Sequence, residues 1–231
     1  MGVFITLPAT LAAEHLSRMG SFDWLCIDLQ HGDLTSQDIS PLISAIAHGG
    51  ATALVRVPDK SHALIGWALD AGATGVVVPT IESAEDAEAA VRATRYPPRG
   101  TRSVGPFRAR IRHGPGYLKE ANQHVYCILM VESVGAALRI DSILEVDGID
   151  AILVGPGDLK LSMHGMESDD PESHIRRVLS ACVRRGVPCG LFIDAADSAQ
   201  RWRSAGMTVL ALGTDVQLLE LGARHRLEPQ E

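Results

Sequence analysis

Five polar residues follow short apolar runs, and together they could carry out acid–base chemistry on a small anion. Each stands where an aliphatic or β-branched run ends, as Arg56 does after Ala53-Leu54-Val55. If these runs are parallel strands of one barrel, their carboxyl ends meet at one rim, which is where such barrels place their active sites. The side chains that would share this rim are Asp28, His31, Arg56, Glu132 and Asp158.

Glu132 and Asp158 form an acidic pair with metal-binding character. Two carboxylates at neighbouring strand ends repel each other unless a cation lies between them, and hard cations such as Mg²⁺ and Mn²⁺ prefer oxygen ligands. The alternative is structural: Glu132 would cap the helix that follows it, and Asp158 would only turn a loop. The spacing alone leaves both interpretations open.

Asp28, His31 and Arg56 could supply the proton transfer and the anion binding. A carboxylate that holds an imidazole fixes its tautomer and raises its basicity, as a general base requires. A guanidinium offers a planar fork for a carboxylate or enolate oxygen, which lysine cannot reproduce. The structural alternatives are an aspartate turn with an exposed histidine, and an ordinary salt bridge.

The elements that must position these residues alternate regularly between strand and helix. The apolar runs lack an in–out alternation, which is typical of strands buried on both faces. Eight strands, each followed by a helix, predict a single-domain α/β protein with a (β/α)8 TIM barrel spanning residues 1–231. We expect strands near 3–7, 23–29, 52–57, 75–79, 125–131, 149–154, 187–192 and 207–212, and helices near 9–19, 36–48, 60–71, 83–94, 133–145, 170–185, 195–205 and 214–225.

One segment, residues 95–124, interrupts this alternation. It is too long for a routine helix-to-strand loop, and it is rich in basic residues. We expect a solvated basic surface or a subunit contact; the alternative is a partial lid that offers an arginine to an anionic substrate. Its basic residues are Arg95, Arg99, Arg102, Arg108, Arg110, Arg112 and Lys119.

Composition excludes several classes of function. The formal net charge of −7 and the aromatic content of 4% argue against nucleic-acid binding, which usually needs a basic face and stacking residues. No apolar stretch approaches the roughly 18 residues that a membrane span requires, so no membrane partner is expected. The four cysteines show no metal-binding spacing, which suggests buried thiols in a reducing cytoplasm.

At these residues the chain resembles the 2,4-dihydroxyhept-2-enedioate (4-hydroxy-2-oxo-heptanedioate) aldolases, which are metal-dependent class II pyruvate aldolases. The resemblance covers nearly the whole chain, and its motifs are specific only in combination. They are Phe22–Gly32, Leu69–Pro79, Tyr96–Gly100 and Gly148–Leu159.

The resemblance implies a divalent metal ion (Mg²⁺, Mn²⁺ or Co²⁺) held by Glu132 and Asp158, and a base formed by His31 with Asp28. It implies Arg56 beside the keto oxygen of pyruvate. The substrates would be pyruvate and a small aldehyde, joined or separated through a metal-stabilised pyruvate enolate.

The resemblance also implies how the substrate and the subunits are held. The backbone at Gly157 and Asp158 would receive the pyruvate carboxylate. The assembly would be a homo-oligomer, a hexamer arranged as a trimer of dimers, in which a neighbouring subunit completes each pocket. Asp70 matches a position in that contact.

Two positions depart from the pattern of many members. Met130 stands where many have glutamine, and Gln30 where many have glutamate. Both lie close in sequence to implied site residues and bear on substrate preference. Two alternatives therefore stay open: an acyl-CoA lyase of the malyl-CoA or citramalyl-CoA type, and a non-catalytic barrel that binds 2-oxo acids.

Overall fold

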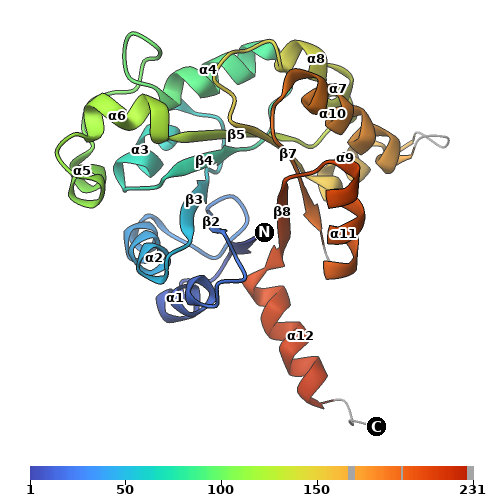
Figure 1. Ribbon diagram of the computed structural model, residues 1–231, viewed down its shortest axis with the longest axis horizontal. Helices are drawn as coiled ribbons and strands as arrows, with labels where there is room; N and C mark the ends of the chain where they lie inside the picture. The colour runs from blue at the N-terminus through green and yellow to red at the C-terminus, as the bar shows by residue number, and fades with distance from the viewer. Residues whose placement is uncertain (166–169, 194, 228–231) are drawn as a thin grey trace.

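Eight parallel strands close into a barrel in chain order, with helices around the outside (Figure 1). The computed structural model describes residues 1–165, 170–193 and 195–227. The prediction of a (β/α)8 barrel is confirmed. The strands are β1 Gly2–Ile5, β2 Trp24–Asp28, β3 Thr52–Arg56, β4 Gly75–Val78, β5 Tyr126–Val131, β6 Ala151–Val154, β7 Cys189–Ile193 and β8 Val209–Thr214.

The helices follow the predicted ranges at most positions. In the capping box of α2, the Thr35 N–H donates to the Asp38 carboxylate at 2.7 Å, which fixes the start of the helix. No helix of the described ranges is long and apolar enough to cross a membrane. The helices are α1 Thr10–Arg18, α2 Ser36–Gly49, α3 His62–Asp70, α4 Ala84–Thr94, α5 Phe107–His113, α6 Tyr117–His124, α7 Val134–Leu138, α8 Ile140–Ile143, α9 Pro156–Ser162, α10 Pro171–Arg185, α11 Ala196–Ala205 and α12 Asp215–Leu227.

Two local predictions were wrong. The expected helix over 133–145 is two short helices, because the backbone at Arg139 (φ −93°, ψ 8°) leaves the helical region between them. The helix α9 was not among the predicted helices, and Pro156 occupies its first helical position. Proline suits that position because its fixed φ is already helical and its missing N–H would have no partner there.

The barrel interior contains a layer of four side chains from alternate strands, as is typical of this fold. Phe192 of β7 packs on Phe4 of β1 with ring centroids 5.6 Å apart. The Arg56 guanidinium of β3 lies 4.9 Å from the centroid of Phe4, and it contacts Met130 of β5. Arg56 is therefore the polar member of an otherwise apolar layer.

The barrel closes between β1 and β8 through Asp215, a buried residue at the end of β8. Its Oδ1 accepts the N–H of Thr6 at 2.9 Å, and its Oδ2 accepts the N–H of Leu7 at 3.1 Å. These bonds continue the β1–β8 pairing past a shift in register. Asp215 thus fixes the carboxyl rim where the first and last strands meet.

The segment 95–124 differs from the expected basic surface. It contains α5 and α6, and both Arg95 and Arg102 are buried. Arg95 donates to the Asp150 carboxylate at 2.8 Å and to the Val125 carbonyl at 2.8 Å. The prediction of solvated arginines was therefore wrong for these two, because each has an acidic partner that is distant in sequence.

Arg102 is a buried residue that connects the segment 95–124 to the rest of the barrel through its side-chain contacts. Its side chain is 0% exposed, and its Nη2 donates to Asp70 at 2.7 Å. Its Nη1 donates to the Tyr117 hydroxyl at 2.9 Å. The guanidinium also lies 4.6 Å from the ring centroid of Tyr96. The side chain therefore joins the end of α3 to α6.

Replacing Arg102 by methionine should lower the free energy of unfolding by about 3 kcal/mol, because Asp70 and the Tyr117 hydroxyl would lose their partner. The measurement is a urea titration of both proteins. Arg99→Met, at an exposed position four residues after Arg95, is the control and should change stability by less than about 0.5 kcal/mol. Equal effects of the two substitutions would contradict a structural role for Arg102.

Candidate active site

A buried ion pair between Asp28 and Arg56 forms the centre of the rim. The β2–β3 register places the two residues side by side. Arg56 Nε donates to Asp28 Oδ1 at 2.8 Å, and Arg56 Nη2 donates to Oδ2 at 2.5 Å. Asp28 is 1% exposed. Such a two-pronged contact fixes the guanidinium in one plane.

The same carboxylate also shapes the turn that carries His31. Asp28 Oδ1 accepts the backbone N–H of Gln30 at 3.1 Å and of His31 at 3.2 Å. Within the described residues, none of the hydrogen bonds that Asp28 accepts comes from the His31 imidazole. The structure therefore brings Asp28 to the backbone of His31 and to Arg56, whereas the sequence suggested a contact with the ring.

Arg56 has a third nitrogen with a weak partner. Its Nη1 lies 3.9 Å from the Met130 sulfur, and a thioether is a poor acceptor. Burial by itself would lower the pKa of Arg56, but the hydrogen bonds and charge of Asp28 outweigh it and raise the pKa above its ordinary value. The guanidinium is therefore permanently charged and has one N–H group available to an incoming anion.

Glu132 lies within electrostatic reach of three of the other predicted residues. Burial is the largest influence and raises the pKa of Glu132; a hydrogen bond from the Thr80 N–H lowers it. The charge of Asp158 raises it again, and the charges of Arg56 and His31 lower it, with a net shift upward. The predicted carboxylates, guanidinium and imidazole therefore converge on one region.

The donor set at this region fits a hard divalent cation. Oε1 of Glu132 accepts the Thr80 N–H at 2.6 Å, while Oε2 accepts no protein hydrogen bond within the described residues. The repulsion from Asp158 would be relieved by a cation between the two carboxylates. The same ranges contain no group of three or more His, Cys, Asp or Glu residues placed to hold a metal, so substrate or water oxygens would complete the shell.

Gly157 and Asp158 are exposed at the start of α9. The first hydrogen bond of this helix runs from the Leu159 N–H to the Gly155 carbonyl at 3.1 Å. The N–H groups of Gly157 and Asp158 precede that bond, as the first N–H groups of a helix do. They therefore belong to the N–H groups that the helix itself leaves without a carbonyl acceptor.

Asp70 does not lie with the other predicted residues in the single chain. It closes α3, and its carboxylate is bound to Arg102. Gln30, one of the two departures from the family pattern, has a buried side-chain oxygen with no hydrogen-bond partner among the described residues.

Sequence reasoning missed three residues that shape the site. Thr80 holds Glu132 through its N–H, and the only signal was its position directly after Pro79 at the end of β4. Phe4 supports the Arg56 guanidinium. Gly155 leaves room for the Glu132 carboxylate. Each acts through backbone or shape, which a search for reactive side chains does not detect.

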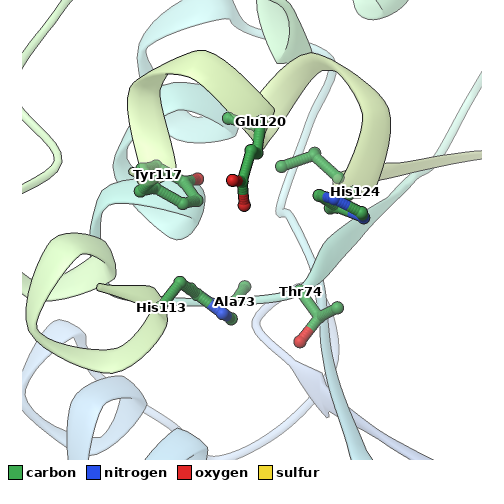
Figure 2. A pocket seen from close by; sticks show the side chains of 8 residues that line it. Ala73, Thr74, His113, Tyr117, Glu120 and His124 are labelled. Atoms are coloured by element: carbon green, nitrogen blue, oxygen red, sulfur yellow. The ribbon is translucent and has the colours of Figure 1, made fainter. Parts of the chain in front are cut away.

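A cavity of about 170 Å³ (Figure 2) is lined by residues that come just before strands, so it lies at the opposite end of the barrel from the rim. His113, Glu120 and His124 line it, together with Thr74 and Val125, which come just before β4 and β5. The Asp28–Arg56 pair, by contrast, lies at the strands' carboxyl ends. Among the described residues, His113, Glu120 and His124 do not form a group that could hold a metal ion. We therefore do not place the chemistry in this cavity.

Comparison with known proteins identifies the family of this chain. The family model "HpcH/HpaI aldolase/citrate lyase" matches residues 1–220. The chain is 34% identical over 226 residues to the hydroxypyruvate/pyruvate aldolase of Rhizorhabdus wittichii, covering 96% of this chain and 90% of that protein. It is 33% identical over 225 residues to the 2-dehydro-3,6-dideoxy-6-sulfogluconate aldolase of Pseudomonas putida, covering 95% and 88%.

Solved structures give the same result. The crystal structure of an HpcH/HpaI aldolase/citrate lyase family protein from Burkholderia cenocepacia superimposes with a TM-score of 0.89 at 34% identity, covering 98% of this chain and 92% of the other. The family model, the relatives and the fold agree along almost the entire length. The chain belongs to the HpcH/HpaI aldolase/citrate lyase family.

Proposed function

We propose that this protein is a metal-dependent class II aldolase, a carbon–carbon lyase that interconverts 4-hydroxy-2-oxo acids with pyruvate and an aldehyde. The observation that carries the proposal is the cluster at the rim, in which Arg56 is bound to Asp28 and contacts Met130, while Met130 and Glu132 both lie against Gly155. The charges of Asp158 and His31 also act on Glu132. The aldolase names of the relatives support it. Substrate and metal are inferred from this chemistry.

Glu132 and Asp158 would hold the divalent ion, Mg²⁺, Mn²⁺ or Co²⁺. When bound, such an ion supplies Lewis-acid polarisation of a 2-oxo acid. The N–H groups of Gly157 and Asp158 would bind the pyruvate carboxylate. Asp28 holds Arg56 in place, and the remaining N–H group of Arg56 would bind the C2 oxygen, where negative charge develops.

His31 would act as the base. In condensation it removes a proton from C3 of pyruvate, giving an enolate whose oxygen lies beside Arg56. C3 then attacks the aldehyde carbon, and the new C4 oxygen takes the proton back from His31. Cleavage runs the same steps in reverse, beginning with removal of the C4 hydroxyl proton. Asp28 would serve this base by fixing the turn on which His31 stands.

The assembly that we propose is a homo-oligomer, a hexamer arranged as a trimer of dimers, with Asp70 in the contact that completes a neighbouring pocket. α12 extends away from the barrel (Figure 1). It exposes Leu219 (62%) and Leu227 (84%). A groove of about 360 Å³, lined in part by Leu218 and Leu221, lies beside it. A second copy would cover these apolar side chains.

The cytoplasm is the expected compartment, because the four cysteines are free thiols and all are buried. An acyl-CoA lyase is the second candidate, since the family description includes citrate lyase. Calorimetric titration with coenzyme A separates the two candidates. An aldolase should show no binding, whereas a CoA-ester lyase should bind the cofactor at micromolar concentrations.

Removing divalent metal with EDTA should abolish aldol cleavage, and adding Mn²⁺, Co²⁺ or Mg²⁺ should restore it. Release of pyruvate from a 4-hydroxy-2-oxo acid is the measurement. Glu132→Gln is the matched control: it should stay inactive after metal is added back, because it lacks one anionic ligand. Full activity in excess chelator would remove the metal from the mechanism.

Substituting Arg56 by alanine should lower kcat/KM by about 10²- to 10³-fold, the usual effect of losing one donor to a developing oxyanion. Arg56→Lys should lose nearly as much, because an ammonium cannot reproduce the paired contacts with Asp28. Steady-state kinetics of cleavage would measure both. A lysine variant with wild-type kcat/KM would contradict the role given to the guanidinium.

His31→Ala should stop the exchange of pyruvate methyl protons with D₂O, which proton NMR follows without any aldehyde present. The exchange needs no aldehyde, so it tests removal of the C3 proton independently of the acceptor. His15→Ala, a histidine on α1, is the control and should exchange at the wild-type rate. Normal exchange in His31→Ala would show that another group is the base.

A further inference from the structure

We propose that Thr80 and Gly155 are positioning residues that fix the Glu132 carboxylate from two sides. Thr80 anchors one oxygen, and Gly155 leaves the space into which the other one turns. This inference rests on the proposed role of Glu132 as a metal ligand. It adds the two residues that would set the direction from which Glu132 meets the ion.

Thr80 has an unusual backbone for its residue type. Its φ is +55°, and it is the only residue other than glycine with a positive φ in the described ranges. A left-handed backbone is unfavourable for a β-branched side chain. It persists here between Pro79 and Ile81, both buried. This conformation points the Thr80 N–H at Oε1 of Glu132, 2.6 Å away.

Gly155 occupies the other side of the same carboxylate. Its φ of −95° is accessible to any residue, so the backbone does not require glycine there. Glycine is favoured there by the lack of space. A Cβ at this position would lie 3.1 Å from Cβ of Glu132 and 3.2 Å from its Oε2. It would also lie 3.3 Å from Cε of Met130. All three contacts are tighter than ordinary van der Waals contact, so an added Cβ would displace Glu132 and Met130 by a few tenths of an ångström.

The two oxygens of Glu132 therefore have different tasks. Oε1 is occupied by a backbone donor from the end of β4, and Oε2 lies over a glycine at the end of β6 without a protein partner in the described residues. Rotation of the carboxylate would break the first contact. A ligand fixed in this way binds a cation without first losing rotational freedom.

The experiment is calorimetric titration of metal-stripped protein with Mn²⁺, which needs no substrate. Gly155→Ala should weaken Mn²⁺ binding by about 10- to 100-fold, as is usual when a support of a metal ligand is disturbed. The control is Gly66→Ala on α3, where an added Cβ meets nothing within 4 Å; it should bind as the wild type does. Wild-type affinity in Gly155→Ala would overturn the role of Gly155.

The double variant Gly155→Ala/Met130→Ala removes the contact with Met130. Affinity should stay low, because the clash with Glu132 remains. Recovery of wild-type affinity would show that the methionine transmits the effect, and would overturn the proposal.

Two variants test Thr80 in the same way. Thr80→Gly keeps the N–H and suits the positive φ, so Mn²⁺ affinity should stay within about threefold of wild type. Thr80→Pro has no N–H and cannot adopt the positive φ, so it should lose about 10- to 100-fold. An unchanged affinity in the proline variant would overturn the role of Thr80.

If the wild-type protein itself bound no Mn²⁺, the proposed metal-binding role of Glu132 would fail. If the wild type bound Mn²⁺ and the variants bound it equally well, only the positioning roles of Thr80 and Gly155 would be refuted.

Discussion

The ion pair between Asp28 and Arg56 is the interaction on which the site depends. Asp28 is fully enclosed, so removing Arg56 would leave a buried charge without a partner, which is costly. The same carboxylate holds the backbone of the turn that presents His31. Asp28 thus orients the Arg56 guanidinium directly and the His31 imidazole through its backbone. The charge of Arg56 in turn favours the ionised form of Glu132.

The apolar layer beneath the Asp28–Arg56 pair strengthens the electrostatic effect of the Arg56 charge. Phe4 and Met130 contact Arg56, and Phe192 packs on Phe4 behind it, so the guanidinium lies against apolar side chains. In such low-polarity surroundings a fixed charge acts more strongly on a neighbouring oxyanion than it would in water. The apolar residues of the barrel interior therefore contribute to the proposed chemistry. The same layer of four side chains is part of the packed core of the barrel.

The sequence predicted the barrel and its rim because both follow from local patterns. An apolar run that ends at a charged residue marks the carboxyl end of a strand, and parallel order brings such ends together. Contacts between distant residues do not follow from such patterns. The pairing of Asp28 with Arg56 rather than the His31 ring, the buried bond from Arg102 to Asp70, and the N–H of Thr80 all depend on register across strands or between helices. The start of α9 was missed because glycine and proline together suggest a turn, although proline also suits the first position of a helix.

The proposed mechanism requires that Glu132 and Asp158 share one cation beside the Asp28–Arg56 pair. Anomalous diffraction at the manganese absorption edge, from crystals grown with Mn²⁺ and oxalate, tests it directly. We expect one strong peak at about 2.0–2.2 Å from a carboxylate oxygen of each residue, with oxalate bound to the same ion. A peak coordinated by other residues, such as those around His113 and His124, with no density between Glu132 and Asp158, would contradict it.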